Sequence, residues 1–360
     1  MAGCSSGNTS GGPSLMDRLT DDLLLEFFAR VPYRSLRRFA CVSRRWRDLI
    51  ADPGNYRKLP QTLAGFSLQR PRTHPPLRAK FADSKEFDYL VINLATEKWV
   101  AVPISRRWSN KVQMARLGFE PAVSSHFHVF EFQFDWAEPE NSDTEGDENS
   151  NSEDEEDGDG HVLGVKIYSS ETGLWSYEQS NWSVDIKLNS DLNSVFVCGM
   201  LYVVATSSVI GAVDVDGRTW KIIGFPHGED SHFMGTDPGF IHLSQGKLHL
   251  TNSDNTTHDK LVMWVLKDRN REKWTLKHTV SFKHLVRKSH VLFGADEFTV
   301  VAIHPDRNMV FFVFGRGKRL MSYDMNSWEV HMISHLGQNC FGQFVPYVPL
   351  FSESLADGQQ

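Results

Sequence analysis

The chain has 360 residues, of which 38 are basic and 45 acidic, so its formal net charge is −7. Hydrophobic residues make up 40% of it, including 24 Phe and 10 Trp, which excludes a wholly disordered chain. Four cysteines without a CxxC pair exclude a disulfide scaffold and indicate a reducing compartment. The longest apolar run, near residues 195–205, is about half of what a membrane helix needs. The sequence therefore predicts an intracellular protein of the cytoplasm, the nucleus or both, with about two domains.

The first 58 residues divide into a leader and a helical domain. Residues 1–14 are rich in Gly and Ser and predict a disordered leader, because they lack the basic and apolar regions of a signal peptide. Residues 15–58 predict three short helices. The first has apolar residues every four positions, widened on one side, with Thr20 as the expected N-cap. Its apolar face is Leu19, Leu23, Leu24, Phe27, Phe28 and Val31.

Pro32 ends that helix, and a short segment over residues 35–40 follows. Val42, Trp46, Leu49 and Ile50 then form a second apolar stripe. Because this helical unit is small, it buries little apolar surface of its own, and we expect it to pack against a partner. Six arginines lie between Arg34 and Arg47 with no acid among them. They are consistent with a solvated face, or with contact to an acidic partner or to nucleic acid.

From residue 60 to residue 352 short β-like runs alternate with polar turns, and a tryptophan recurs after one turn in each repeat. The five repeat tryptophans are Trp99, Trp175, Trp220, Trp274 and Trp328. They are 76, 45, 54 and 54 residues apart. A period near 50 is typical of kelch-like propeller blades, in which a large aromatic fills the gap between neighbours. We therefore predict an all-β propeller of five or six blades, closed by strands near residues 63–68 and 344–351, with a disordered tail over 353–360. The alternative is that tryptophans coincide by chance in another all-β domain.

The long first interval has its own explanation. Residues 138–159 contain 12 acidic residues and no basic one, which leaves 38 basic and 33 acidic residues elsewhere, a net charge of +5. This composition cannot bury apolar area, so residues 138–160 predict a disordered insertion within one blade. Removing it shortens the first interval to 53 residues. Solvation is its simplest role. The alternatives are attraction of a basic partner and masking of a basic face of this chain.

No catalytic motif for nucleophilic, nucleotide or metallopeptidase chemistry occurs. His126 and His128 alternate along one predicted strand, but no further metal ligands stand near them. His242 and His249 flank a predicted hairpin and are expected to be packed or surface residues. We therefore expect no catalytic residue, no metal and no cofactor.

Residues 17–53 resemble the F-box motif. An LP-type start, a Leu-rich helix, a second LP-type turn and a V-[CS]-x-x-W helix fall in the expected order, with Thr20 where the family usually has proline. The matching residues are Leu19, Leu23, Leu24, Phe27, Val31, Pro32, Leu36, Val42 and Trp46. The remainder is similar to the propeller-like associated domain of plant F-box proteins, most clearly over 118–132 and 298–312.

The resemblance implies an α+β multidomain chain, in which a small three-helix F-box precedes an all-β kelch-like propeller. It implies a non-catalytic substrate-recognition subunit of a Skp-cullin-F-box ubiquitin ligase. The nine matching residues would dock on a Skp-type adaptor, which leads to a cullin-RING ligase, while the propeller binds an unknown target protein. Neither a membrane nor nucleic acid is expected as a partner. The alternative is a β-propeller lectin or enzyme acting on a small ligand, with an appended helical docking module.

Overall fold

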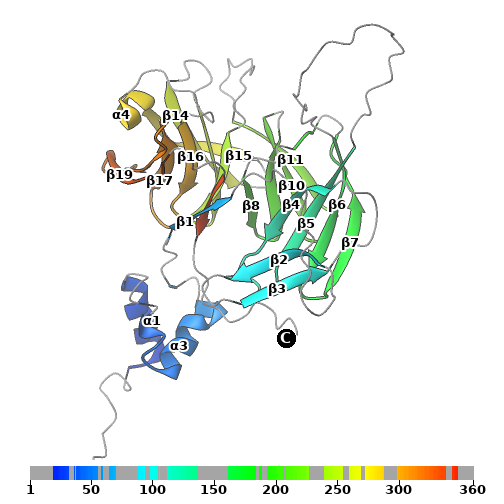
Figure 1. Cartoon of the computed structure of the whole chain (residues 1–360), viewed down its shortest axis with the longest axis horizontal. Coiled ribbons are helices and arrows are strands. Elements are labelled where there is room, and N and C mark those ends of the chain that lie inside the picture. The colour runs from blue at the N-terminus through cyan, green and yellow to red at the C-terminus, as the bar shows by residue number, and fades with distance from the viewer. Residues whose placement is uncertain are drawn as a thin grey trace, which may run out of the picture.

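The computed structural model describes a chain that is mostly β, with few helices (Figure 1). The residues described are 19–31, 36, 38–55, 58–59, 65–69, 87–93, 98–103, 105, 112–135, 161–183, 186–188, 193–205, 208–226, 239–253, 259–268, 272–287, 298–337 and 343–347. None of the helices in these ranges is long and apolar enough to cross a membrane. The predicted leader, acidic insertion and tail lie outside the described residues.

The N-terminal unit contains α1 (Asp21–Arg30), α3 (Arg44–Ala51) and the 3₁₀ turn η2 (Pro53–Asn55). Leu36 and residues 38–39 are helical between them, but the intervening positions 32–35 and 37 lie outside the described residues, so the third helix stays a prediction. Thr20 is the N-cap of α1 by position, yet its side chain makes no capping hydrogen bond, contrary to the expectation. In α3 the Ser43 hydroxyl accepts a bond from the Trp46 amide at 3.2 Å.

Four sheets each consist of four strands that follow one another in the chain and pair antiparallel. The first sheet contains β4 (Val112–Gly118), β5 (His128–Asp135), β6 (His161–Ser169) and β7 (Leu174–Gln179). The second contains β8 (Ser194–Val197), β9 (Met200–Ala205), β10 (Val209–Asp214) and β11 (Trp220–Gly224). The third contains β12 (Phe240–Ser244), β13 (Lys247–Ser253), β14 (Lys260–Asp268) and β15 (Lys273–Ser281), followed by α4 (Phe282–Val286). The fourth contains β16 (Phe298–Ile303), β17 (Met309–Phe314), β18 (Arg319–Asp324) and β19 (Glu329–His335).

Two further sheets have two strands each. One pairs β2 (Phe87–Asn93) with β3 (Lys98–Pro103), and the other pairs β1 (Gly65–Gln69) with β20 (Gln343–Tyr347). The antiparallel pairing of β1 with β20 joins two segments almost 300 residues apart in sequence, and it confirms that the predicted closing strands near 63–68 and 344–351 meet. They form a sheet of their own, and within the described ranges there is no closed sheet.

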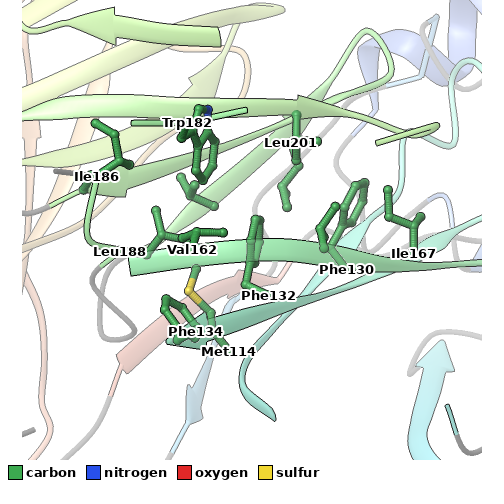
Figure 2. Packing of buried hydrophobic residues seen from close by; sticks show 14 residues of the cluster. Met114, Phe130, Phe132, Phe134, Val162, Ile167, Trp182, Ile186, Leu188 and Leu201 are labelled. Carbon is green, nitrogen blue, oxygen red and sulfur yellow. The ribbon is translucent and has the colours of Figure 1, made fainter. Parts of the chain in front are cut away.

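The sheets are arranged in series through their first strands. β4 contacts β8, β8 contacts β12, β12 contacts β16 and β16 contacts β20. Hydrophobic side chains fill the space between consecutive sheets. In the first of these layers Phe130 and Phe132 on β5 and Leu201 on β9 are fully buried, and the Trp182 ring stacks on Phe132 with 6.1 Å between centroids (Figure 2). One small sheet cannot bury both faces alone, so each uses its neighbours as partners, which is consistent with a propeller-like domain.

The position of the acidic insertion follows from the first sheet. Asp135 at the end of β5 pairs with His161 at the start of β6. The segment between them therefore connects two adjacent antiparallel strands. The boundaries expected from the sequence, 15–58 for the helical domain and 60–352 for the β domain, stay predictions.

Candidate functional site

The helical unit has its own small core, and three of the nine expected docking residues belong to it. Leu24, Leu36 and Trp46 are buried together with Leu25, Phe28, Ile50 and Leu59. The Trp46 ring meets the Phe28 ring edge-on, with 5.2 Å between centroids. Side chains buried in this way hold the helices together and present little surface to a partner.

Three other expected docking residues lie on the outside of the same unit. Leu23, Phe27 and Val42 are 52%, 43% and 62% exposed, and we refer to them as the apolar trio. Leu23 and Phe27 share one face of α1, because they are four residues apart. The Phe27 ring stacks on the Phe39 ring at 5.6 Å, and Val42 stands three residues beyond Phe39. Two more expected residues, Leu19 and Val31, are partly buried against the core, and Pro32 lies outside the described residues.

The sequence missed Leu25, which is 5% exposed and belongs to the core. The expected face combined Leu19, Leu23, Leu24, Phe27, Phe28 and Val31. Of these, α1 turns Leu24 and Phe28 inward together with Leu25, and leaves Leu23 and Phe27 exposed. Several apolar residues in a row leave the direction of the core open. The position of the Trp46 ring decides it here, a signal that only the packing of α3 supplies.

One arginine of the basic run joins the two helices. Arg45 on α3 donates to the Asp21 carboxylate at 2.9 and 2.6 Å and to the Leu19 carbonyl at 2.6 Å. Arg38, Arg44 and Arg47 are exposed, while Arg34 and Arg37 lie outside the described residues. The exposed cations stand on the same unit as the apolar trio, which favours an acidic partner surface.

In the β domain the expected repeat tryptophans take up related but unequal places. Trp175, Trp274 and Trp99 are each the second residue of the fourth or last strand of a sheet, and Trp220 is the first. The Trp175 indole donates to the Pro103 carbonyl at 2.8 Å, and the Trp274 indole donates to the Gly224 carbonyl at 2.9 Å. Pro103 and Gly224 end the last strands of the preceding sheets, so each bond joins neighbouring sheets. Trp328 differs, because it precedes β19 and lies in the turn.

Two buried histidines lie opposite each other on the third sheet. His242 and His249 pair across β12 and β13 and are nearly inaccessible. The His249 Nδ1 donates to the Lys247 carbonyl at 3.0 Å, and its Nε2 accepts from the Lys277 ammonium at 3.1 Å. Burial lowers the pKa of His242 to about 3 and that of His249 to about 4, so both rings are neutral at pH 7.

No three His, Cys, Asp or Glu side chains come together as a metal site in the part of the chain that the structure describes. His126 and His128 each keep a buried Nδ1 atom without a hydrogen-bond partner. A second charged cluster is the ion pair between Lys166 on β6 and Glu131 on β5, with 3.9 Å between nitrogen and oxygen. The Ser105 hydroxyl bridges the two by accepting from Lys166 and donating to Glu131.

Comparison with known proteins agrees with this division into a small helical unit and a set of sheets. A helical unit with an exposed apolar trio, followed by propeller-like sheets, defines an F-box protein: residues 16–58 match the F-box domain family. Residues 148–345, more than half of the chain, match the β-propeller family of At3g26010-like F-box proteins. The chain therefore belongs to this family of F-box proteins, which is consistent with a plant F-box protein.

None of the curated proteins compared with the chain matches it. Among solved structures, the β-propeller domain of Myceliophteria thermophila Cps50 (Swd1) is 8% identical, with a TM-score of 0.32, and the match covers 49% of this chain and 55% of that one. U3-55K is 11% identical, with a TM-score of 0.28, and the match covers 58% of this chain and 49% of that one. The chain thus spans about half the length of each of these structures.

Proposed function

We propose that this chain is the substrate-recognition subunit of a Skp-cullin-F-box ubiquitin ligase, acting in the cytoplasm or the nucleus. The observation that carries the proposal is the apolar trio Leu23, Phe27 and Val42, which stays exposed on a unit that matches the F-box family. In this role the chain performs no covalent step. It raises the effective concentration of target lysines near a ubiquitin-charged conjugating enzyme.

The exposure of the nine expected docking residues supports a division of labour among them. The apolar trio, with the partly buried Leu19 and Val31 at its border, contacts the Skp-type adaptor. Leu24, Leu36 and Trp46 act indirectly, because they keep α1 and α3 in place. Pro32, which lies outside the described residues, remains a proposed contact.

We also infer that the β domain has five blades, with β20, β1, β2 and β3 together forming the fifth. Three observations support this count. The first strands contact one another in the series β4, β8, β12, β16 and β20. The sheet of β2 and β3 packs against the first sheet through Val102, Phe127 and Tyr168. Trp99 has the same place in β3 that Trp175 has in β7.

The docking proposal predicts that Leu23→Asp with Phe27→Asp weakens binding to a purified Skp-type adaptor at least about 30-fold, because two exposed apolar contacts become charged. The binding is measured by titration calorimetry with the full chain. The matched control is Leu174→Asp, an equally drastic change at an exposed leucine on β7. The control should bind as the parent does. Unchanged affinity in the double variant, with its circular dichroism also unchanged, would show that the trio is not the docking surface.

A further inference from the structure

The turn between β18 and β19 contains a tryptophan where a related turn has glycine. Trp328 has φ +64, a left-handed backbone that a bulky side chain rarely adopts. In the turn between β6 and β7 the corresponding residue is Gly173, with φ +70. Both residues donate their backbone N–H to the carbonyl four positions earlier at 2.8 Å, so the two turns have the same geometry. A tryptophan in this conformation is strained relative to glycine.

The side chain of Trp328 joins the preceding sheet by packing on His278 of β15, and not by an indole hydrogen bond. Trp175 and Trp274 each donate an indole hydrogen bond to the preceding sheet, whereas the Trp328 indole has no hydrogen-bond partner among the described residues. Its ring packs on His278 at 4.8 Å, and its carbonyl accepts a bond from His284 on α4 at 2.7 Å. The ring is therefore held in place, yet it is 50% exposed.

The strand that follows Trp328 is an open edge. β19 is the last strand of the fourth sheet, and no described strand pairs with its outer side. Met332 and Ile333 are exposed on it, and a β-bulge leaves Ile333 between the pairs Met321–Met332 and Leu320–Ser334. Natural edge strands usually carry a charge that prevents further pairing, often a lysine. β3, β11 and β15 contain lysine, whereas β7 and β19 contain neither lysine nor arginine; the one carboxylate of β19 is that of Glu329, which lies 3.5 Å from His331.

Cations stand at both ends of this edge. At the Trp328 end, α4 and the residue that caps it carry Lys283 and Arg287, and the bond from His284 to the Trp328 carbonyl keeps α4 there. At the other end lies the turn with Arg316, Lys318 and Arg319. It is joined to the end of β19 by the bond from the Leu336 amide to the Lys318 carbonyl at 2.9 Å. None of these five cations forms an ion pair with a described residue.

We propose that β19 is the edge on which the target protein is bound, a step that rests on the proposed substrate-recognition role. The occupant is an extended segment of the target that adds to the fourth sheet as a fifth strand. Its central residues are apolar and cover Trp328, Met332 and Ile333. Acidic residues at both of its ends meet the cations of α4 and of the turn between β17 and β18. Trp328 acts as the anchor, because a rigid, half-exposed tryptophan loses little conformational entropy on binding.

The test uses a library of nine-residue peptides that vary at every position, panned on the full chain. Enriched peptides should alternate apolar residues in the centre and carry Asp or Glu at both ends. Their affinity should fall at least about tenfold in Trp328→Gly and in Ile333→Lys. The matched control is Tyr177→Lys on β7, because Tyr177 and Ile333 are 51% and 50% exposed. No enrichment, or enriched peptides that bind the two β19 variants as they bind the parent, would overturn the proposal.

Trp328→Gly also separates recognition from a structural role. Glycine adopts φ +64 without strain, so the melting temperature of this variant should be no lower than that of the parent. A clear drop in melting temperature would instead show that Trp328 is there for packing. The β19 variants should keep full affinity for the Skp-type adaptor, and Leu23→Asp with Phe27→Asp should keep full affinity for the peptides. If the parent chain enriches the expected peptides but does not bind the adaptor, the proposed function alone is contradicted. If it binds the adaptor but enriches no such peptides, the β19 edge alone is contradicted.

Discussion

Leu23 and Trp46 stand in the same F-box pattern, yet the first is 52% exposed and the second only 8%. At the residue scale, this difference separates side chains that a partner can reach from those that hold the unit together. Leu24 and Leu36 belong with Trp46, and Phe27 and Val42 belong with Leu23. The F-box motif includes all of these residues, but it does not distinguish those that a partner can contact from those that pack inside the unit.

Truncation of Trp46 should therefore destabilise the helical unit and abolish adaptor binding indirectly. We expect Trp46→Ala to lower the unfolding free energy of this unit by about 3–5 kcal/mol, because the edge-on contacts with Phe28 and Phe39 are lost. Val42→Ala, at an exposed position, should change it by less than about 0.5 kcal/mol. Urea denaturation followed by far-ultraviolet circular dichroism measures both. Equal stability of the two variants would contradict the core position of Trp46.

At the element scale, the β12–β13 hairpin shows how two histidines are used as packing residues. His242 lies within 3.3 Å of the Thr251 hydroxyl, measured from its Nε2 atom, and His249 bridges the Lys247 carbonyl and the Lys277 ammonium. A protonated His249 would face this ammonium directly. Of the two expected alternatives, packed or surface residues, the structure shows that both histidines are packed.

The stability of the β domain should consequently fall in mild acid. The pKa values of His242 and His249 drop from 6.5 to about 3 and about 4 on folding, so between these limits the unfolded chain binds more protons. The contribution of these two histidines to the free energy of unfolding is therefore fully present above pH 6.5. It decreases towards pH 4, by up to about 1.4 kcal/mol per pH unit for each histidine. Urea denaturation between pH 4 and 7 measures this slope. His249→Gln should reduce it, and an unchanged slope in this variant would contradict the assignment.

At the scale of the whole molecule, consecutive sheets share hydrophobic layers, and the sequence of the acidic insertion falls between two strands of the first sheet. Asp135 and His161 pair at the point where the insertion leaves and rejoins the first sheet. Residues 138–159 alone carry a charge of −12, whereas the remaining residues have a net charge of +5, which together give −7. The insertion does not interrupt the order of the sheets.

Replacement of residues 138–160 by Asn-Gly should leave the fold intact, because four residues then connect β5 to β6 and such a length suits a hairpin. A shorter loop has a smaller closure entropy, so the unfolding free energy should be unchanged or up to about 2 kcal/mol higher. Chemical denaturation and adaptor binding are measured together. Stronger adaptor binding by the shortened chain would reveal that the insertion masks the basic helical unit. A lower free energy of unfolding would show that residues 138–160 contribute to the packing of the sheets, which contradicts the prediction.

By itself the sequence determined the class of protein, because motif spacing and composition are local features of the chain. It also offered the terminal strands as candidates for pairing, and the structure shows that β1 and β20 pair. Only the tertiary structure decided which apolar residues are exposed, since burial depends on the direction from which α3 packs on α1. It also showed that Trp328 takes the place of a turn glycine. The spacing of the tryptophans could not predict this, because spacing does not determine a backbone dihedral angle.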